Sequence, residues 1–415
     1  MAIIKPFAAV RPTDKEVKNV AALPYDVVNR EEAKEIVKNQ PNSFLKIDRA
    51  EVQLESSVST YDQQVYLRAR DTLNEMINEG IFIREDKKVF YLYQLTMDGR
   101  KQTGLVACSS IDDYINNVIK KHEKTREAKE QDRINHVDYC NAQTGPIFLA
   151  YRSNDTIKNI VDEVKEANKP IYDFVADDNI GHTVWIINED EKIEAIEKAF
   201  VAIENTYIAD GHHRTASAVK VGLKRREENP GYNGSEMFNY FLSVIFPQDE
   251  LMILPYNRVV RDLNGNDEGS LIEEISKSFE VELIGEEPFQ PTEKETFGMF
   301  LNDNWYKLTI DKALVDNEDP VKKLDVSLLQ DYLLDPILNI KDPRVDDRID
   351  FVGGIRGLKE LEKRATSDMK VAFSMYPTSI EELFEVSDAD KLMPPKSTWF
   401  EPKLRSGIFI NTIDK

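Results

Sequence analysis

The densest group of reactive side chains follows a short apolar run at residues 206–209. A glycine at this point lets a ligand approach the backbone closely, and a helix that begins here offers unpaired N–H groups to an anion. An arginine adds a planar guanidinium that suits phosphate oxygens. The pattern therefore predicts a buried strand, a phosphate-binding turn and a helix. The predicted phosphate-binding residues are Gly211, His212, His213, Arg214 and Thr215.

Asp210 stands directly before this turn and does not suit a passive anion pocket, because its carboxylate would repel phosphate oxygens. It could bind a Mg²⁺ ion that bridges phosphates, or accept the proton of an attacking hydroxyl group. We therefore predict Asp210 as a catalytic residue and metal ligand, and His213 as a second catalytic residue. The alternative that Asp210 only caps the helix stays open. His212 and His213 are not expected to serve one group, since neighbouring helical residues point about 100° apart.

A second polar group lies at residues 122–126 and combines cations, a hydroxyl group and a carboxylate. It could hold a polyphosphate or a substrate carboxylate, although a solvated helix with ordinary surface charge has the same composition. It is not a zinc motif of the HExxH type, because an arginine stands where the second histidine would be. The residues predicted here are His122, Lys124, Thr125 and Arg126 for phosphate binding and Glu123 for catalysis.

Two further segments supply weaker candidates. A turn at residues 23–27 could present Asp26 as another catalytic carboxylate, although such residues often only close a turn. The C-terminal segment collects positive charge and hydroxyl groups in an otherwise acidic chain, which suits an anion but also an ordinary charged loop. Lys396 and Ser397 are predicted to bind phosphate, and Lys403 belongs to the same basic tail.

Composition narrows the function classes. The 415 residues include 54 basic and 75 acidic side chains, a net charge of −21. Such a charge repels phosphate backbones and argues against a nucleic-acid partner. The sequence has no stretch of about 20 apolar residues and no signal-peptide pattern, so we predict a cytoplasmic protein with no membrane partner. Two cysteines, Cys108 and Cys140, exclude a disulfide scaffold and a four-cysteine zinc site.

The surrounding pattern mixes helices and strands. Asn29 can cap a helix at residues 30–39, and Asp98-Gly99 predicts the turn of a hairpin between strands at 89–96 and 103–109. From residue 147 strands and helices alternate, and the helix after the glycine turn is expected over 215–228. The polar run after residue 126 predicts no regular element. A linker candidate at 264–270 divides the chain into domains 1–262 and 263–415, the second of α+β type.

The residues 210–214 resemble the ParB/sulfiredoxin superfamily, whose members place a similar turn at a helix start to hold nucleotide phosphates. His212 stands where sulfiredoxins have cysteine, so their sulfur chemistry is not implied. The best motif match is the free-serine kinase branch, which carries Asp-Gly-His-His-Arg. Over nearly its full length the chain also resembles an uncharacterised prokaryotic ParB-like family. The resembling segments are residues 23–28, 122–126, 209–214 and 393–398.

This resemblance implies an α+β fold with a ParB/sulfiredoxin-like core, large insertions and a C-terminal α+β region. It implies a small-molecule kinase that phosphorylates the hydroxyl group of a free amino acid, with L-serine first. ATP, ADP or pyrophosphate would be the donor and Mg²⁺ the cofactor, and a homodimer is compatible with it. The serine kinases use an earlier glutamate near the hydroxyl, for which Asp26 and Glu123 are the candidates. The alternatives are a nucleotide-binding regulator with little turnover and a metal-assisted phosphohydrolase.

Overall fold

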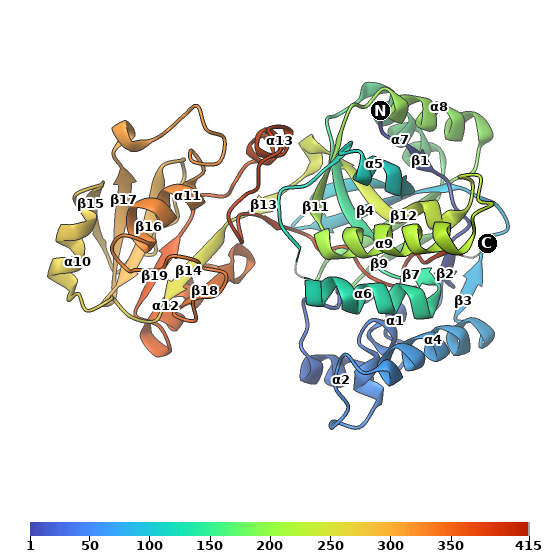
Figure 1. Ribbon diagram of the computed structural model, residues 1–415, viewed down its shortest axis with the longest axis horizontal. Helices are drawn as coiled ribbons and strands as arrows, with labels where there is room; N and C mark the ends of the chain where they lie inside the picture. The colour runs from blue at the N-terminus through green and yellow to red at the C-terminus, as the bar shows by residue number, and fades with distance from the viewer. Residues whose placement is uncertain (126, 414–415) are drawn as a thin grey trace. The chain divides into compact units, whose positions relative to one another are not determined.

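The structure is a computed structural model that describes residues 1–125 and 127–413, so Arg126 lies outside the described residues. The chain forms two compact units (Figure 1). The first contains Met1–Leu251 and the residues from Pro402 onward, and the second contains Met252–Glu401. Residues 264–270 form a turn and the start of helix α10 (Glu268–Ile275) inside the second unit. The sequence boundary at 262/263 also falls inside that unit.

A nine-stranded mixed sheet organises the first unit, in the order β6-β11-β8-β12-β5-β4-β10-β9 with β1 beside β5. The predicted hairpin is confirmed, with Asp98 at φ 51° and Gly99 at φ 79° in the turn between β4 and β5. The strand β11 lies next to β6, which places residues 119–120 beside residues 206–207. The strands are β1 (Ile4–Lys5), β4 (Phe90–Met97), β5 (Arg100–Ser110), β6 (Ile119–Lys120), β8 (Ile147–Tyr151), β9 (Tyr172–Val175), β10 (Gly181–Ile187), β11 (Thr206–Asp210) and β12 (Tyr240–Pro247).

Apolar side chains of the sheet pack against helices in the main core of this unit. Ile208 of β11, Phe241 of β12 and Ala218 of α9 belong to this core. The burial of these side chains is the main favourable term in folding. Because β11 and the first half of α9 are anchored in this core, the turn between them is held on both sides. The helices that pack here are α5 (Ile111–Ile115), α7 (Asp155–Ala167), α8 (Asp190–Val201) and α9 (His212–Glu228).

A second helical layer covers α9, and Figure 1 shows α9, α6 and α4 in succession. The capping box predicted by Asn29 is present and includes Glu32. The helix α6 was not predicted, because it lacks the apolar stripe of an ordinary surface helix. It is nevertheless stable in this place because α4 and α9 pack on it. This layer contains α1 (Val17–Val20), α2 (Arg30–Asn39), α3 (Leu45–Asp48), α4 (Gln63–Asn78) and α6 (Glu127–Cys140), with short strands β2 (Val10–Pro12), β3 (Phe82–Arg84), β7 (Ala142–Gln143) and β21 (Asn411–Thr412).

The second unit has its own six-stranded sheet, in the order β15-β17-β16-β19-β14-β18, and a separate apolar core around Trp305. Both units therefore mix helices and strands, which confirms the predicted mixed class. The described part of the chain contains no helix with the length and apolarity needed to cross a membrane. The elements of this unit are β13 (Ile253–Leu254), β14 (Tyr256–Val260), α10, β15 (Phe279–Gly285), β16 (Thr296–Leu301), β17 (Asn304–Ile310), α11 (Asp325–Leu329), β18 (Ile349–Gly353), α12 (Leu358–Ser367), β19 (Val371–Ser374), α13 (Ile380–Asp388) and β20 (Trp399–Phe400).

Candidate functional site

The turn between β11 and α9 has the strand–glycine–helix geometry that the sequence predicts. Gly211 adopts φ +100° at the N-cap position of α9, and no side chain caps the helix there. A side chain at this position would be strained by the left-handed backbone. Its Cβ would also lie 3.2 Å from two guanidinium nitrogens of Arg214. The turn thus keeps backbone N–H groups and a guanidinium together, as an anion site requires.

Asp210 does not cap the helix but is held by two cations. Its Oδ2 accepts a hydrogen bond from Lys403 Nζ at 2.9 Å, and Arg214 Nη2 lies 3.9 Å from its Oδ1. Burial raises the pKa of this carboxyl, but the charges of Lys403 and Arg214 outweigh burial and hold the pKa below its usual range. Asp210 is therefore ionised at neutral pH. Lys403 was noticed in the sequence only as part of the basic tail.

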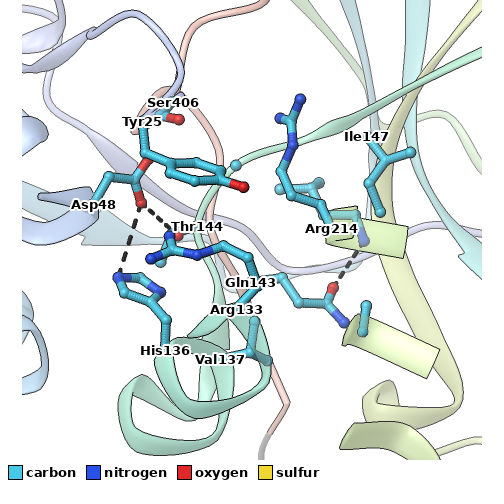
Figure 2. Close-up of a pocket in the computed structure, with 13 residues that line it drawn as sticks. Tyr25, Asp48, Arg133, His136, Val137, Gln143, Thr144, Ile147, Arg214 and Ser406 are labelled. Carbon is cyan, nitrogen blue, oxygen red and sulfur yellow. Dashed lines mark hydrogen bonds and ion pairs between the residues drawn. The ribbon is translucent and has the colours of Figure 1, made fainter. Parts of the chain in front are cut away.

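Arg214 connects this turn with the interior of the unit. Its Nη1 donates a hydrogen bond to the carbonyl oxygen of Pro146 at 2.7 Å, and its side chain is largely buried. Part of it lines a small cavity, here called the inner cavity, of about 30 Å³ (Figure 2). A space of this size holds one or two water molecules rather than a ligand. Figure 2 shows Arg214 on one side of this space and Asp48, His136 and Arg133 on the other.

Two histidines far apart in the sequence meet beside Asp210. The rings of His122 and His212 are both buried, with centroids 4.5 Å apart and planes at 89°. His122 Nδ1 and His212 Nε2 are buried and have no hydrogen-bond partner. Burial lowers the pKa of His122 to about 4, and burial and the neighbouring His122 lower the pKa of His212. Both rings are neutral at pH 7, and each leaves a ring nitrogen for a ligand.

The remaining residues of the two motifs have mixed surroundings. Glu123 is half-exposed, with Oε2 3.9 Å from His212 Nδ1. Thr125 donates a hydrogen bond to Glu130 of α6, which also binds Lys220. Lys124 is exposed. Thr215 is buried, and its hydroxyl group donates a hydrogen bond to the Gly211 carbonyl at 3.0 Å. The carbonyl of His213 accepts a hydrogen bond from the hydroxyl group of Ser217.

Three further predicted residues belong to other segments of the described chain. Asp26 is exposed and lines a second cavity, treated below. Lys396 and Ser397 belong to the second unit. There Lys396 Nζ donates to the hydroxyl of Tyr256 at 3.1 Å, and Ser397 Oγ donates to the carbonyl of Pro394 at 2.7 Å. The hydroxyl of Ser397 is thus engaged within its own loop.

A buried polar group on α6 and α3 was not predicted from the sequence. Arg133 Nε donates to Asp132 Oδ2 at 2.9 Å, and its guanidinium lies 4.1 Å from the ring centroid of Tyr25. Asp48 accepts a hydrogen bond from Thr144 at 2.9 Å (Figure 2). Burial lowers the pKa of Arg133, and the anions beside it outweigh burial and raise it. The only sequence signal was the run of charged residues that follows residue 126.

This group forms the wall between the inner cavity and a larger one of about 200 Å³, here called the helical cavity. Both cavities are lined by the same four side chains, Tyr25, Asp48, Arg133 and His136. Arg214 lines only the inner cavity. The helical cavity is further lined by Asp26, Arg49, Ala50, Glu51, Thr60, Tyr61, Val65, Tyr66, Lys129 and Asp132.

Metal binding is limited by the number of ligands. Among residues 1–125 and 127–413 no group of three or more His, Cys, Asp or Glu side chains is arranged to hold a metal ion. Asp210 can supply one carboxylate, because its Oδ1 has only the distant contact with Arg214. Mg²⁺ is commonly bound through one or two carboxylates, with phosphate and water as the other ligands. The donor set therefore fits Mg²⁺ only together with a phosphate ligand.

Comparison with solved structures finds several that align with about three quarters of this chain. A mutant of a free serine kinase in complex with ADP has 14% identity and a TM-score of 0.36, over 74% of this chain and 92% of that one. The C-terminally truncated SbnI from Staphylococcus aureus has 11% identity and a TM-score of 0.39, over 74% and 87%. A conserved hypothetical protein from Pyrococcus furiosus has 16% identity and a TM-score of 0.35, over 74% and 95%. These scores are too low to support an argument about fold or activity.

The search of curated proteins returned no match. The comparison with family models is more specific. The model described as "Protein of unknown function (DUF1015)" matches residues 4–327, which include both polar motifs and the turn at Gly211. This chain belongs to that family.

Proposed function

We propose that this protein is a phosphotransferase that moves a phosphoryl group from a nucleoside phosphate, or another polyphosphate, to the hydroxyl group of a free amino acid. L-serine is the acceptor to test first. The observation that carries the proposal is the turn at Gly211. It combines an uncapped helix start, a guanidinium and a carboxylate kept ionised by Lys403. A passive anion pocket has no need of that carboxylate.

The donor phosphates would lie against the first turn of α9. The N–H groups there and the positive end of the helix dipole favour anions. The free Nε2 of His212 lies beside the same turn and, carrying the proton of a neutral imidazole, can donate one hydrogen bond to a phosphate oxygen. His122 donates its single N–H to the carbonyl of Ile208, so its free Nδ1 can only accept a hydrogen bond. Arg214 would add charge neutralisation. Phosphoryl transfer depends on such positioning and charge more than on covalent chemistry.

Asp210 suits a charge-bearing role better than that of a general base. An effective base has a pKa near the working pH, whereas Lys403 and Arg214 hold the pKa of Asp210 below its usual range despite burial. We therefore assign Asp210 to Mg²⁺, which would neutralise phosphate charge when bound. Glu123 is half-exposed beside His212 and is the better candidate to take the hydroxyl proton.

In the transfer step the acceptor oxygen forms a bond to the terminal phosphorus atom. The bond from that phosphorus to its bridging oxygen breaks, and the leaving phosphate keeps the electron pair. The hydroxyl proton passes to Glu123 or to water. The product is a phosphomonoester of the acceptor.

Phosphorus NMR tests this proposal directly. The purified protein and Mg²⁺ are incubated with ATP, ADP or pyrophosphate, each with and without L-serine. A new phosphomonoester signal that requires serine supports the kinase and identifies the donor. Free phosphate without dependence on an acceptor contradicts it and favours a phosphohydrolase. Donor binding in a calorimetric titration without consumption contradicts it and favours a regulator.

Arg214→Ala provides the matching variant. It should abolish donor binding, because the guanidinium beside Gly211 is lost. Arg225→Ala is the control, since Arg225 lies on the same helix and pairs with Asp138 at 2.8 Å. Equal loss of binding in the two variants would contradict a specific role for Arg214. A ParB/sulfiredoxin-like core, the division at residue 262 and a cytoplasmic location remain predictions that belong with this proposal.

A further inference from the structure

The helical cavity contains a charge pattern that the donor site does not use. Four acids and three bases line its space of about 200 Å³. This volume lies below the roughly 300 Å³ at which pockets for larger organic ligands begin. An excess of acids also disfavours a phosphate, because the carboxylates would repel it. A ligand of this cavity is therefore small and carries no net negative charge.

Most of these charges are already paired within the protein. Arg49 Nε lies 2.8 Å from Glu51 Oε1, and Arg133 is paired with Asp132. Asp48 accepts the hydroxyl hydrogen bond of Thr144. Buried charges of this kind are tolerated because they are paired. They form the wall of the cavity, and a ligand would compete poorly for them.

Two charges remain for a ligand. Among the described residues, the side chains of Asp26 and Lys129 have no hydrogen bond or ion pair. They come from different elements, the turn before α2 and the first turn of α6, and both line the helical cavity. They are not within ion-pair distance of each other. One free carboxylate and one free ammonium in a small cavity are the complement of a zwitterion.

The surrounding groups suit a small polar molecule with a hydroxyl group. Burial raises the pKa values of Tyr25 and Tyr66 to about 12, so both phenols stay protonated. Tyr66 already donates its hydrogen bond to Asp132 at 3.0 Å, so Tyr25 is the phenol that can donate to a ligand. Thr60 adds another hydroxyl group to the lining. The wall shared with the inner cavity also lies between this space and Arg214. An acceptor here would therefore adjoin the arginine of the donor site.

We infer that the helical cavity is the acceptor site and binds a hydroxy amino acid by its two charges, with Asp26 on the α-ammonium group and Lys129 on the α-carboxylate. The inference rests on the proposed function for the role of the ligand. It also changes the role predicted for Asp26, which becomes a binding residue rather than a catalytic one.

Crossed ligand binding tests the inference without a donor. L-serine, L-threonine and L-homoserine are titrated into the full chain by calorimetry or ligand-observed NMR, and the tightest is kept. Two probes accompany it: ethanolamine has the amine but no carboxylate, and 3-hydroxypropanoate has the carboxylate but no amine. Asp26→Asn should weaken the amino acid and ethanolamine about tenfold or more and leave 3-hydroxypropanoate unchanged. Lys129→Ala should weaken binding of the amino acid and 3-hydroxypropanoate about tenfold or more and leave ethanolamine binding unchanged.

The controls are Asp14→Asn and Lys169→Ala, which change exposed charges outside the cavity and should leave all three ligands unaffected. Failure of the wild-type protein to bind any of the amino acids would overturn the inference. A variant that loses affinity for ethanolamine and for 3-hydroxypropanoate equally would overturn it as well. The crossed pattern without a phosphomonoester would keep the amino-acid site and reject the kinase. A phosphomonoester without the crossed pattern would keep the kinase and reject this site.

Discussion

The turn at Gly211 and the helical cavity differ in how their residues are brought together. At the turn, neighbours in the sequence are neighbours in space, because one strand end and one helix start present residues 210–214. In the cavity, the lining comes from the turn before α2, from α3 and α4, and from α6. A contiguous motif can be recognised by its local geometry, whereas a distributed cavity exists only after the helices pack. Four substitutions can break or sharpen this contrast.

The largest effect is expected in the cavity wall. Asp132→Ala removes the partner of buried Arg133 and an acceptor of the Tyr66 hydroxyl hydrogen bond. A buried charge without its partner costs about 3–5 kcal/mol, so we expect a loss of that size in the free energy of unfolding by urea denaturation. Asp71→Ala breaks an exposed pair with Arg70 and should cost no more than about 0.5 kcal/mol. Similar losses in both variants would mean that the wall is not a buried ion pair.

Asp210→Asn tests the turn at Gly211 through activity rather than through stability. The amide lacks the charge that faces Lys403 and Arg214, but the backbone of the turn at Gly211 is unchanged. Turnover should fall about 100-fold, in the range found when one electrostatic group of an active site is removed, while the Kd for the donor changes little. Initial rates from phosphorus NMR measure turnover, and calorimetric titration measures the Kd for the donor. Asp86→Asn, at an exposed residue, is the control. Normal turnover would refute the role of Asp210.

Gly211→Ala probes the backbone of the turn. The change forces a side chain into φ +100° and brings its Cβ to 3.2 Å from the Arg214 guanidinium. Strain of this type costs about 1–3 kcal/mol, and we expect donor affinity to fall about 10- to 100-fold. Gly231→Ala is matched, since a Cβ there meets nothing within 4 Å. Titration of both variants with ADP measures the difference, and equal affinities would show that the turn does not bind the donor.

The smallest effect concerns pH. Burial lowers the pKa of His122 from 6.5 to about 4 in the folded chain. Between these values the unfolded chain binds a proton that the folded chain does not, so stability is complete above pH 6.5 and is lost as the pH falls towards 4. This histidine contributes at most about 1.4 kcal/mol per pH unit. His122→Gln removes this proton from the balance between the folded and unfolded chains. The slope of unfolding free energy against pH should therefore fall by about 1.4 kcal/mol per pH unit between pH 4 and 6.5. An unchanged slope would mean that the ring is charged when folded.

Several elements follow from local rules and were predicted correctly. Asn29 caps α2, and the positive φ values at Asp98 and Gly99 are those that Asp-Gly favours in a hairpin. The positive φ of Gly211, between β11 and α9, also follows from such a local rule. In each case residues a few positions apart determine the backbone, so no distant contact is needed to predict it.

Other features depend on distant contacts and were missed or misplaced. The helix α6 has polar residues on most of its surface, and its stability comes from packing between α4 and α9. Lys403 reaches Asp210 across 193 positions of sequence. Glu123 and Asp26 looked alike as candidate carboxylates, but the first lies beside His212 and the second lines the helical cavity. No spacing rule distinguishes such pairs.

The sequence by itself determined the strand–glycine–helix geometry of the turn, because Asp210, Gly211 and Arg214 follow a buried strand without interruption. It also determined the mixed class of the fold through its alternating patterns. Only the tertiary structure decided that Lys403 keeps Asp210 ionised, that His122 and His212 meet with free ring nitrogens, and that Asp26 and Lys129 line one cavity. The physical reason is that charge pairing and desolvation depend on separation in space, which the order of residues does not contain.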